Sequence, residues 1–347
     1  VYKRQGPDLP FAIYGLTTYY LNTSNLTACR DVAQMLMELS EQPGFERHRA
    51  AAHLQLGFVN VFSGQLEAAL SEVENNRRHY EKSDHTDFAR RYGQDPGATA
   101  FAMGTLPAWQ LGHVDLALEY GQRGVALAKQ QNDPFTLAVC QVFLTLTHIC
   151  RRERAQALAL AEQTIELCEH QQFPQWLHQA RVTRGWALAD GSATTAEGLA
   201  EVRSALSGLA TVSAVIGAPI FMVLLAQSLM AAGMNEPALA TVKQALVDSS
   251  ARGNKWMDAE LLRLQALLEA RLENPDWSAV GVLLQRSLAE ARRTSSRLPE
   301  VRSLCATDQF GLATAEHYAR LEVLAGELDE GQGTADMLNV QAVLARR

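Results

Sequence analysis

The side chains best suited to metal binding or nucleophilic chemistry are five cysteines and nine histidines, and they are dispersed along the chain. The cysteines form no CxxC pair, no HExxH motif places two histidines on one helix face, and Cys168 with His170 is too isolated to form a site. We therefore interpret the cysteines as small core residues of a protein in a reducing cytoplasm, and we expect no metal and no cofactor. The cysteines are Cys29, Cys140, Cys150, Cys168 and Cys305.

Acidic residues are the second possible source of chemistry, because paired carboxylates or acidic clusters carry the reactions of some all-helical toroid enzymes. Here they are scattered: Glu72 and Glu74 are expected on a surface stripe, and Asp329 in a loop. The chain also contains no GxxxxGK[ST] motif to hold nucleotide phosphates. We predict that this chain alone is not an enzyme. A toroid enzyme is the alternative, and it would require carboxylates to converge in one cavity.

The charge balance disfavours nucleic acid as a partner. The formal net charge is −7 at pH 7, whereas binding to phosphates needs a concentrated basic face. The basic residues form short clusters, which we interpret as solvated helix ends; a docking patch for an acidic partner is the alternative. These clusters are Arg77–Arg78, Arg90–Arg91, Arg151–Arg152 with Arg154, and Arg292–Arg293.

Aromatic residues are the remaining candidates for ligand contact. Trp109 and Trp186 fall in helices that we expect to line a concave surface, where an aromatic ring can hold a peptide. Packing between helices is the favoured role for all five tryptophans, and His148 and His178 face the same choice. The candidate partner-binding residues are Tyr92, Gln94, Asp95, Trp109, His148 and Trp186.

A repeat of about 40 residues positions these side chains. A small residue followed by Leu or Val recurs in steps of 40, 41, 40 and 41 residues, at Ala117, Ala157, Gly198, Ala238 and Ala279. In the first four copies a branched apolar residue follows eight positions later. Because one helix pair cannot bury its apolar face alone, a fixed period of this size indicates stacked helix pairs.

The first helix of each pair is expected to begin at a turn signal followed by a bulky residue, as in Asp133-Pro134-Phe135. Proline suits this position because its missing N–H would be unpaired there in any case. Hydrophobic residues make up 47% of the chain, and no long alternation of period two predicts a sheet. The expected fold class is all-α: a solenoid of about seven to eight antiparallel helix pairs.

The repeat also predicts how the chain is divided. Residues 1–8 are expected to be disordered or non-native, 9–80 to form the first helix pairs, 98–330 the regular repeats and 331–347 a capping helix. Residues 81–97 form a long connection and the expected hinge. Within it, the segment Tyr92 to Gly97 is either a binding loop or a stiff spacer. Its ordinary turn and helix-start residues favour the spacer.

One uncharged segment, between Arg203 and Glu236, has the length of a membrane span. It is interrupted by Gly217 and Pro219 and keeps the phase of the repeat, so we expect two helices and a turn instead. The first residues lead into no apolar segment with a cleavage site, so no signal peptide is expected. The start at Val1 rather than Met predicts a fragment of a longer protein. We expect a cytoplasmic location and no membrane contact.

Several segments resemble the tetratricopeptide-like C-terminal region of large bacterial signalling proteins. They are residues 91–97 (RYGQDPG), 172–174 (QFP), 184–189 (RGWALA), 260–264 (ELLRL) and 333–336 (GTAD). In those proteins a class III adenylate/guanylate cyclase domain, or a DNA-binding domain, precedes a P-loop signal-transduction ATPase and then the helical array. The resemblance covers roughly residue 10 to the end. It departs at Ala266, where the family tends to have glycine, and at residues 148–150 and 190–193.

This resemblance implies a tetratricopeptide-like right-handed solenoid that acts as a non-catalytic sensor or scaffold arm in intracellular signal transduction. Its partner would be a protein or peptide, or upstream ATPase or cyclase domains of the same polypeptide. An effector that prefers one curvature of the array would shift the equilibrium of the attached switch. The alternative is a free-standing adaptor that holds partner peptides on its concave face.

Overall fold

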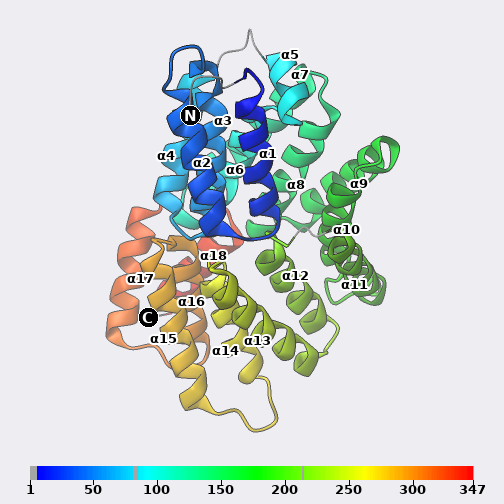
Figure 1. Cartoon of the computed structure of the whole chain (residues 1–347). Coiled ribbons are helices and arrows are strands. Elements are labelled where there is room, and N and C mark those ends of the chain that lie inside the picture. The colour runs from blue at the N-terminus through cyan, green and yellow to red at the C-terminus, as the bar shows by residue number, and fades with distance from the viewer. Residues whose placement is uncertain (1–5, 81–84, 213–214, 347) are drawn as a thin grey trace.

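The computed structural model describes residues 6–80, 85–212 and 215–346, and every regular element in these ranges is a helix (Figure 1). Eight antiparallel helix pairs account for most of this part of the chain, which confirms the expected all-α solenoid. The pairs are α1 (Leu9–Asn22) with α2 (Leu26–Ser40), α3 (Arg49–Phe62) with α4 (Leu66–His79), α6 (Pro96–Leu111) with α7 (Val114–Gln130), α8 (Pro134–Cys150) with α9 (Arg154–Gln171), α10 (Pro174–Leu188) with α11 (Thr195–Thr211), α12 (Ala218–Ala231) with α13 (Asn235–Arg252), α14 (Asp258–Glu269) with α15 (Trp277–Arg293), and α16 (Arg297–Gln309) with α17 (Ala315–Glu327).

Three further helices stand outside these pairs: the short η1 (Glu46–His48), α5 (His85–Tyr92) and the C-terminal α18 (Ala335–Ala345). The expected connection 81–97 therefore contains a helix, α5, rather than loop alone. Parts of the expected segments lie outside the described residues: 1–5 of the N-terminal segment, 81–84 of the connection, 213–214 of the uncharged segment, and residue 347.

A small buried residue in the second helix of most pairs sets the repeat. It is the fourth residue of six of these helices: Cys29, Ala69, Ala117, Ala157, Gly198 and Ala238. There is no room for more, because a Cβ on Gly198 would lie 2.4 Å from the Gly185 carbonyl oxygen of α10. In α15 the fourth residue is Val280, which is fully buried, whereas Ala279 is half-buried. The fifth copy is thus one residue later than expected, because Asp276 caps α15 and fixes its start.

Several first helices begin at capped turns, as their sequences predict. The Asp95 carboxylate accepts a hydrogen bond from the Ala98 N–H at 2.7 Å, and Pro96 occupies the first position of α6. Asp133 caps α8 in the same way, accepting from the Phe135 and Thr136 N–H groups at 3.1 Å. These caps fix the residue at which each helix begins.

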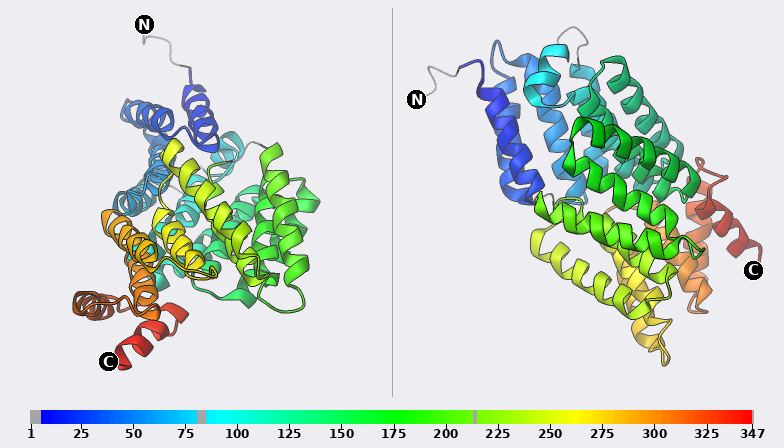
Figure 2. Two further views of the ribbon diagram at one scale, coloured as in Figure 1. Left: turned by 90° about the horizontal axis from the view of Figure 1, so that it is seen from below. Right: turned by 90° about the vertical axis from the view of Figure 1, so that its right-hand side faces the viewer.

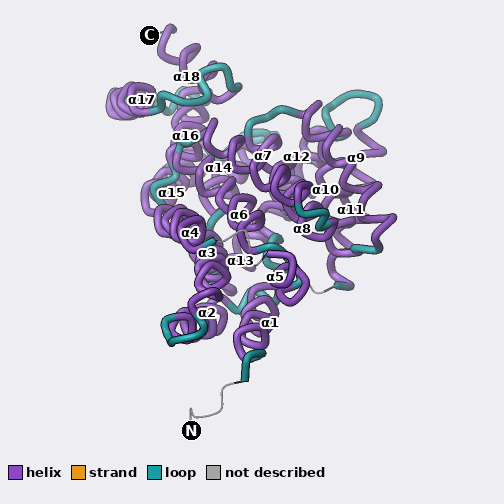
Figure 3. Tube along the Cα trace, turned by 90° about the horizontal axis from the view of Figure 1, so that it is seen from above, coloured by secondary structure: helices purple, strands orange, loops and turns teal. Residues whose placement is uncertain are grey.

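The solenoid closes on itself. Helices α2, α4, α15 and α17 lie along one outer edge and α9 and α11 along another (Figure 3). Figures 1 and 2 show α13 to α16 beneath α1 to α4. The second half touches the ends of the first: the Trp256 and Phe62 rings are 5.7 Å apart, and the Ser296 hydroxyl donates to Gln110 Oε1 at 3.0 Å. The interior is therefore enclosed from both halves of the chain.

All five cysteines are buried and unpaired. Burial raises the pKa of the Cys29 thiol to about 12, so this thiol stays protonated at neutral pH and packs as a small apolar group. Within the described ranges, the helices are too short or too polar to cross a bilayer. The described part of the uncharged segment forms the end of α11, a turn and α12.

Candidate functional site

Two adjoining cavities occupy the interior of the solenoid. The first, the aromatic cavity, has a volume of about 210 Å³ and is lined by α1, α3, α6, α8, α10, α12, the end of α5 and the segments before α12 and α14. The second, the arginine cavity, has a volume of about 330 Å³ and is lined mainly by α6, α8, α10, α12, α14 and α16. Ile220 contributes to both. Together they fall within the range of roughly 300–1,000 Å³ that is typical of ligand pockets.

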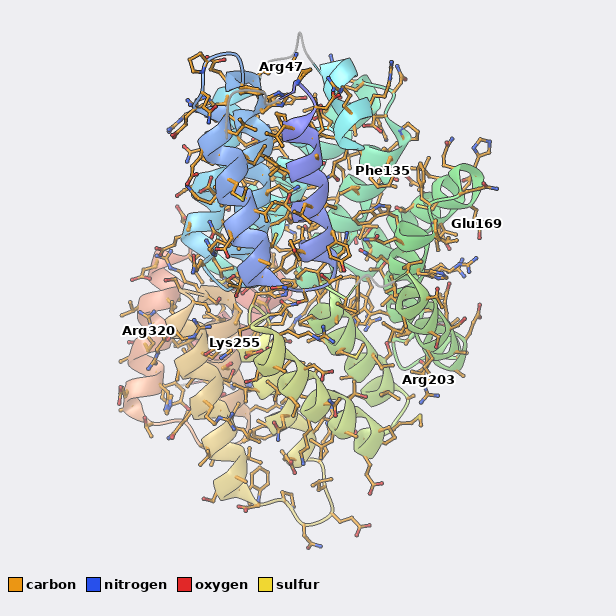
Figure 4. All side chains as sticks on the ribbon, in the orientation of Figure 1. Arg47, Phe135, Glu169, Arg203, Lys255 and Arg320 are labelled. Carbon is orange, nitrogen blue, oxygen red and sulfur yellow. The ribbon has the colours of Figure 1, made fainter. Side chains whose placement is uncertain are left out.

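Aromatic rings dominate the first cavity. They come from six helices and from Trp256, and some contact each other across helix pairs: Phe58 and Phe143 have ring centroids 6.2 Å apart. Within the described part of the chain, no charged side chain lines this cavity. It is therefore suited to uncharged apolar groups. The rings are Tyr14, Phe58, Phe62, Tyr92, Phe135, Phe143, Trp176, Phe221 and Trp256, of which Phe135 is labelled in Figure 4.

Two residues that line the same cavity carry buried polar atoms without a partner. Gln55 and Trp256 are 1% and 4% exposed, and neither Gln55 Oε1 nor Trp256 Nε1 has a hydrogen-bond partner among the described residues. Leaving a buried polar atom unpaired costs about 1–3 kcal/mol. One atom is an acceptor and the other a donor, which are the two functions that a peptide group needs from its surroundings.

At the edge of the aromatic cavity, the end of α5 is fixed to neighbouring helices. Gln94 Nε2 donates to the Tyr14 hydroxyl at 2.7 Å, and the Tyr14 and Tyr92 rings are 4.5 Å apart. The Tyr92 hydroxyl lies 2.6 Å from His48 Nδ1. Burial lowers the pKa of His48 to about 4, so the imidazole is neutral at pH 7. The two groups therefore share a hydrogen bond between neutral partners.

The arginine cavity contains a network of buried ions. Arg302 on α16 donates from Nε to both carboxylate oxygens of Asp336 at 3.0 Å, and from Nη2 to the Cys150 carbonyl at 2.6 Å. Burial works to lower the pKa of Arg302, but Asp336 and Glu260 outweigh it and raise the pKa above its usual value. Arg263 pairs with Glu260 on the same helix, with Nη2 donating to Oε1 at 2.6 Å.

Two further guanidinium groups reach this cavity, one from the turn between α8 and α9 and one from the first residue of α9. Arg152 Nη2 lies 2.9 Å from Asp336 Oδ1. Arg154 stacks 4.0 Å above the Trp186 ring, and its Nη1 donates to the Trp186 carbonyl at 2.5 Å. The expectation that this basic cluster is a solvated helix end is therefore wrong for Arg154. It is also wrong for Arg151, whose side chain is only 10% exposed. The solenoid's curvature brings α10 and α18 against this turn.

The structure distributes the six candidate residues over three environments. Tyr92 and Gln94 line the aromatic cavity, and Trp109 and Trp186 line the arginine cavity. The other two line neither cavity. Asp95 is fully buried, where it caps α6 and accepts a 2.9 Å hydrogen bond from the Tyr80 hydroxyl, and His148 Nδ1 lies 2.6 Å from Glu153.

Other cavity residues were not anticipated from the sequence. Gln55 lies in an unremarkable position of the repeat, and only its burial with an unpartnered oxygen marks it. Trp256 was weighed with the other tryptophans and assigned to packing between helices. Arg263 and Glu260, three residues apart, look like an ordinary helix-surface pair in the sequence. Aromatic residues such as Phe143 carried the available signal, since they recur on the first helix of the first six pairs, from α1 to α12. Across the described residues, no three histidine, cysteine, aspartate or glutamate side chains gather where they could hold a metal ion.

Comparison with known proteins identifies the fold. No known family matches the sequence, and no curated protein matches it. A structure of a Rap protein complexed with Competence and Sporulation Factor is 8% identical, covers 98% of both chains and has a TM-score of 0.61. NprR in complex with its cognate peptide NprX is 11% identical, covers 97% of this chain and 98% of that chain, with a TM-score of 0.58. The Rap conjugation gene regulator of plasmid pLS20 with the Phr* peptide is 11% identical, covers 98% of this chain and 94% of that chain, and scores 0.53. At these identities the likeness shows a shared tetratricopeptide-like helical repeat fold.

Proposed function

We propose that this chain is a non-catalytic sensor or adaptor that binds a short, mainly apolar peptide in the aromatic cavity. The observation that carries the proposal is that two residues lining an uncharged aromatic cavity, Gln55 and Trp256, carry a buried acceptor and a buried donor without partners. A bound peptide would donate a backbone N–H to Gln55 and accept at a carbonyl from Trp256, while its side chains pack on the rings.

The comparisons support a peptide over other small apolar ligands. Three structures of the same fold, over nearly their whole length, are described as complexes with a named peptide or factor. An extended peptide presents alternating donors and acceptors between apolar side chains, which matches a cavity that mixes aromatic rings with the amides of Gln94, Gln175 and Gln179. A hydrocarbon or lipid tail would leave Gln55 and Trp256 unpaired.

Binding in this cavity would couple to the shape of the solenoid. The lining comes both from the first helix pairs and from Trp256, which belongs to the second half of the chain. A ligand that touches both halves favours the closed arrangement over a more open one by its differential affinity for the two. We propose that this shift in curvature is the output of the sensor.

The test is Gln55→Leu, which removes the unpaired acceptor and keeps the volume. Retention of a synthetic hexapeptide library is measured by affinity selection and mass spectrometry. We expect retention to weaken by roughly 3- to 10-fold, the size of one neutral hydrogen bond, without loss of thermal stability. Gln141→Leu is the matched control, because Gln141 is also buried with an unpartnered Oε1 but lines neither cavity. Equal retention by wild type and Gln55→Leu would refute the proposed contact.

The context of the sensor is a further part of the proposal. The resemblance of residues 91–97 and 184–189 to bacterial signalling proteins supports an array that regulates an ATPase or cyclase in a cytoplasmic signalling protein, whereas the peptide complexes of the same fold favour an adaptor at least as well. Sequencing the gene upstream of Val1 separates these alternatives. A GxxxxGK[ST] motif followed by a Walker B aspartate supports the first, and a start codon close to Val1 supports the second.

A further inference from the structure

The arginine cavity has fewer negative charges than positive ones. Four guanidinium groups reach it, and the carboxylates paired with them belong to Glu260 and Asp336. Asp336 is shared by Arg302 and Arg152, and Glu260 lies 2.6 Å from Arg263 and 3.8 Å from Arg302. The site therefore carries two more positive than negative charges in a partly enclosed space, where such an imbalance is costly unless an anion completes it.

Arg154 is the guanidinium that lacks a counterion. In the described part of the chain it forms no ion pair, and its Nη1 hydrogen bonds go to the Trp186 carbonyl at 2.5 Å and the Ala187 carbonyl at 3.3 Å. Asp190 acts on Arg154 only from a distance, from a fully solvated position. Burial lowers the pKa of Arg154, as expected for a half-buried cation without a carboxylate partner.

Neighbouring groups hold the guanidinium groups in place. Arg154 lies 4.0 Å above the Trp186 ring, whose Nε1 donates to Gln227 Oε1 at 2.7 Å, and Arg302 lies 4.6 Å above the Trp109 ring. Stacking on an aromatic face orients a guanidinium and leaves its edge N–H groups free for hydrogen bonds. Arg302 already uses Nε and Nη2 on Asp336 and the Cys150 carbonyl, whereas Arg154 uses only Nη1 within the described residues, so its Nε and Nη2 edge faces no described acceptor. A planar carboxylate matches this arrangement, because two parallel N–H groups can bind its two oxygens.

We infer that the arginine cavity binds a carboxylate of the same peptide whose apolar part lies in the aromatic cavity. This inference rests on the proposed function. The two cavities share Ile220 in their linings, and one is uncharged whereas the other has excess positive charge, so a ligand that reaches both would be apolar along its length and anionic at one end. That carboxylate is either the peptide's C-terminal α-carboxylate or an Asp or Glu side chain.

Three hexapeptide libraries distinguish these sources, each built from apolar, aromatic, Ser, Asn and Gln residues. The first has a free α-carboxylate, the second is C-terminally amidated, and the third is amidated and carries one Asp or Glu. Affinity selection with mass spectrometry measures retention of each. Preferred retention of the first library identifies the terminal carboxylate, and preferred retention of the third identifies an acidic side chain. Equal retention of the first two, without preference for the third, overturns the inference while the proposed function stands. If none is retained, both fail.

The variant that tests the site is Arg154→Gln. It removes a charge that pairs with no carboxylate, and we expect roughly 10-fold or greater loss of retention of the preferred acidic library, with retention of the amidated library unchanged. Arg152→Gln is a second variant. The Arg152 side chain is 44% exposed, so its replacement should leave the packing of the core intact. The matched control is Arg203→Gln on the outer helix α11, where the side chain is exposed (Figure 4). Unchanged acid preference in both cavity variants overturns the inference.

Discussion

Replacing Asp336 by Asn should free the C-terminal helix α18 from the rest of the solenoid. Asp336 is 4% exposed and accepts three hydrogen bonds from Arg302, which is itself 9% exposed, and it also pairs with Arg152. Breaking a buried ion pair by neutralising one partner costs about 3–5 kcal/mol, and the half-exposed contact to Arg152 adds at most about 1 kcal/mol. Because Asn keeps one acceptor oxygen, we expect a loss of about 3 kcal/mol.

Hydrogen–deuterium exchange of residues 335–345 measures this loss directly. An opening free energy lowered by about 3 kcal/mol corresponds to roughly 100-fold faster exchange, at about 1.36 kcal/mol per factor of ten. Asp329→Asn is the matched control, because the same change falls on an exposed loop residue just before α18. Exchange within threefold of wild type in Asp336→Asn would show that the Asp336–Arg302 pair contributes little net stability, and would refute the reasoning.

Three further substitutions test the packing and the pH dependence. Gly185→Ala should lower the free energy of unfolding, measured with urea, by about 1–3 kcal/mol, since the added Cβ would lie 2.7 Å from the Gly198 carbonyl oxygen. Gly281→Ala, whose Cβ would have its nearest neighbour at 3.9 Å, should raise stability by up to about 1 kcal/mol; a loss there would contradict the helix-propensity argument. Burial disfavours the charged form of His48 and lowers its pKa from 6.5 to about 4, so the fold keeps its full stability above pH 6.5 and should lose up to about 3 kcal/mol as the pH falls from 6.5 to 4. In His48→Gln, which can still bond Tyr92, the stability measured by urea unfolding should vary less over that range, and an unchanged pH profile would exclude His48 as the cause.

The repeat itself could be predicted because it is written in local spacing. Ala117, Ala157, Gly198 and Ala238 are buried at the fourth residue of their helices, as a stack of helix pairs requires. The fifth copy was misplaced by one residue, since the helix start depends on the Asp276 cap rather than on a constant period. Residue types within one helix pair thus determine which helices pack and on which face.

The candidate site was only partly predictable for the same reason. Trp109 and Trp186 were recognised as inner-helix aromatics and they do line a cavity, but nothing in their neighbourhood indicated that Arg302 and Arg154 would stack on them. Gln55 gave no signal at all, because an unpaired acceptor exists only when the surrounding groups are placed in space.

The amino-acid sequence by itself determined the helices, their pairing and the class of fold, because each of these depends on contacts between neighbouring repeats. Only the tertiary structure decided which distant groups meet: the Cys150 carbonyl and Arg302 are 152 residues apart in sequence, and Asn254 reaches Ser24 across 230 residues. Such contacts depend on the small rotation between successive helix pairs, summed over the whole array. No single repeat encodes that sum, and it is the sum that encloses the two cavities.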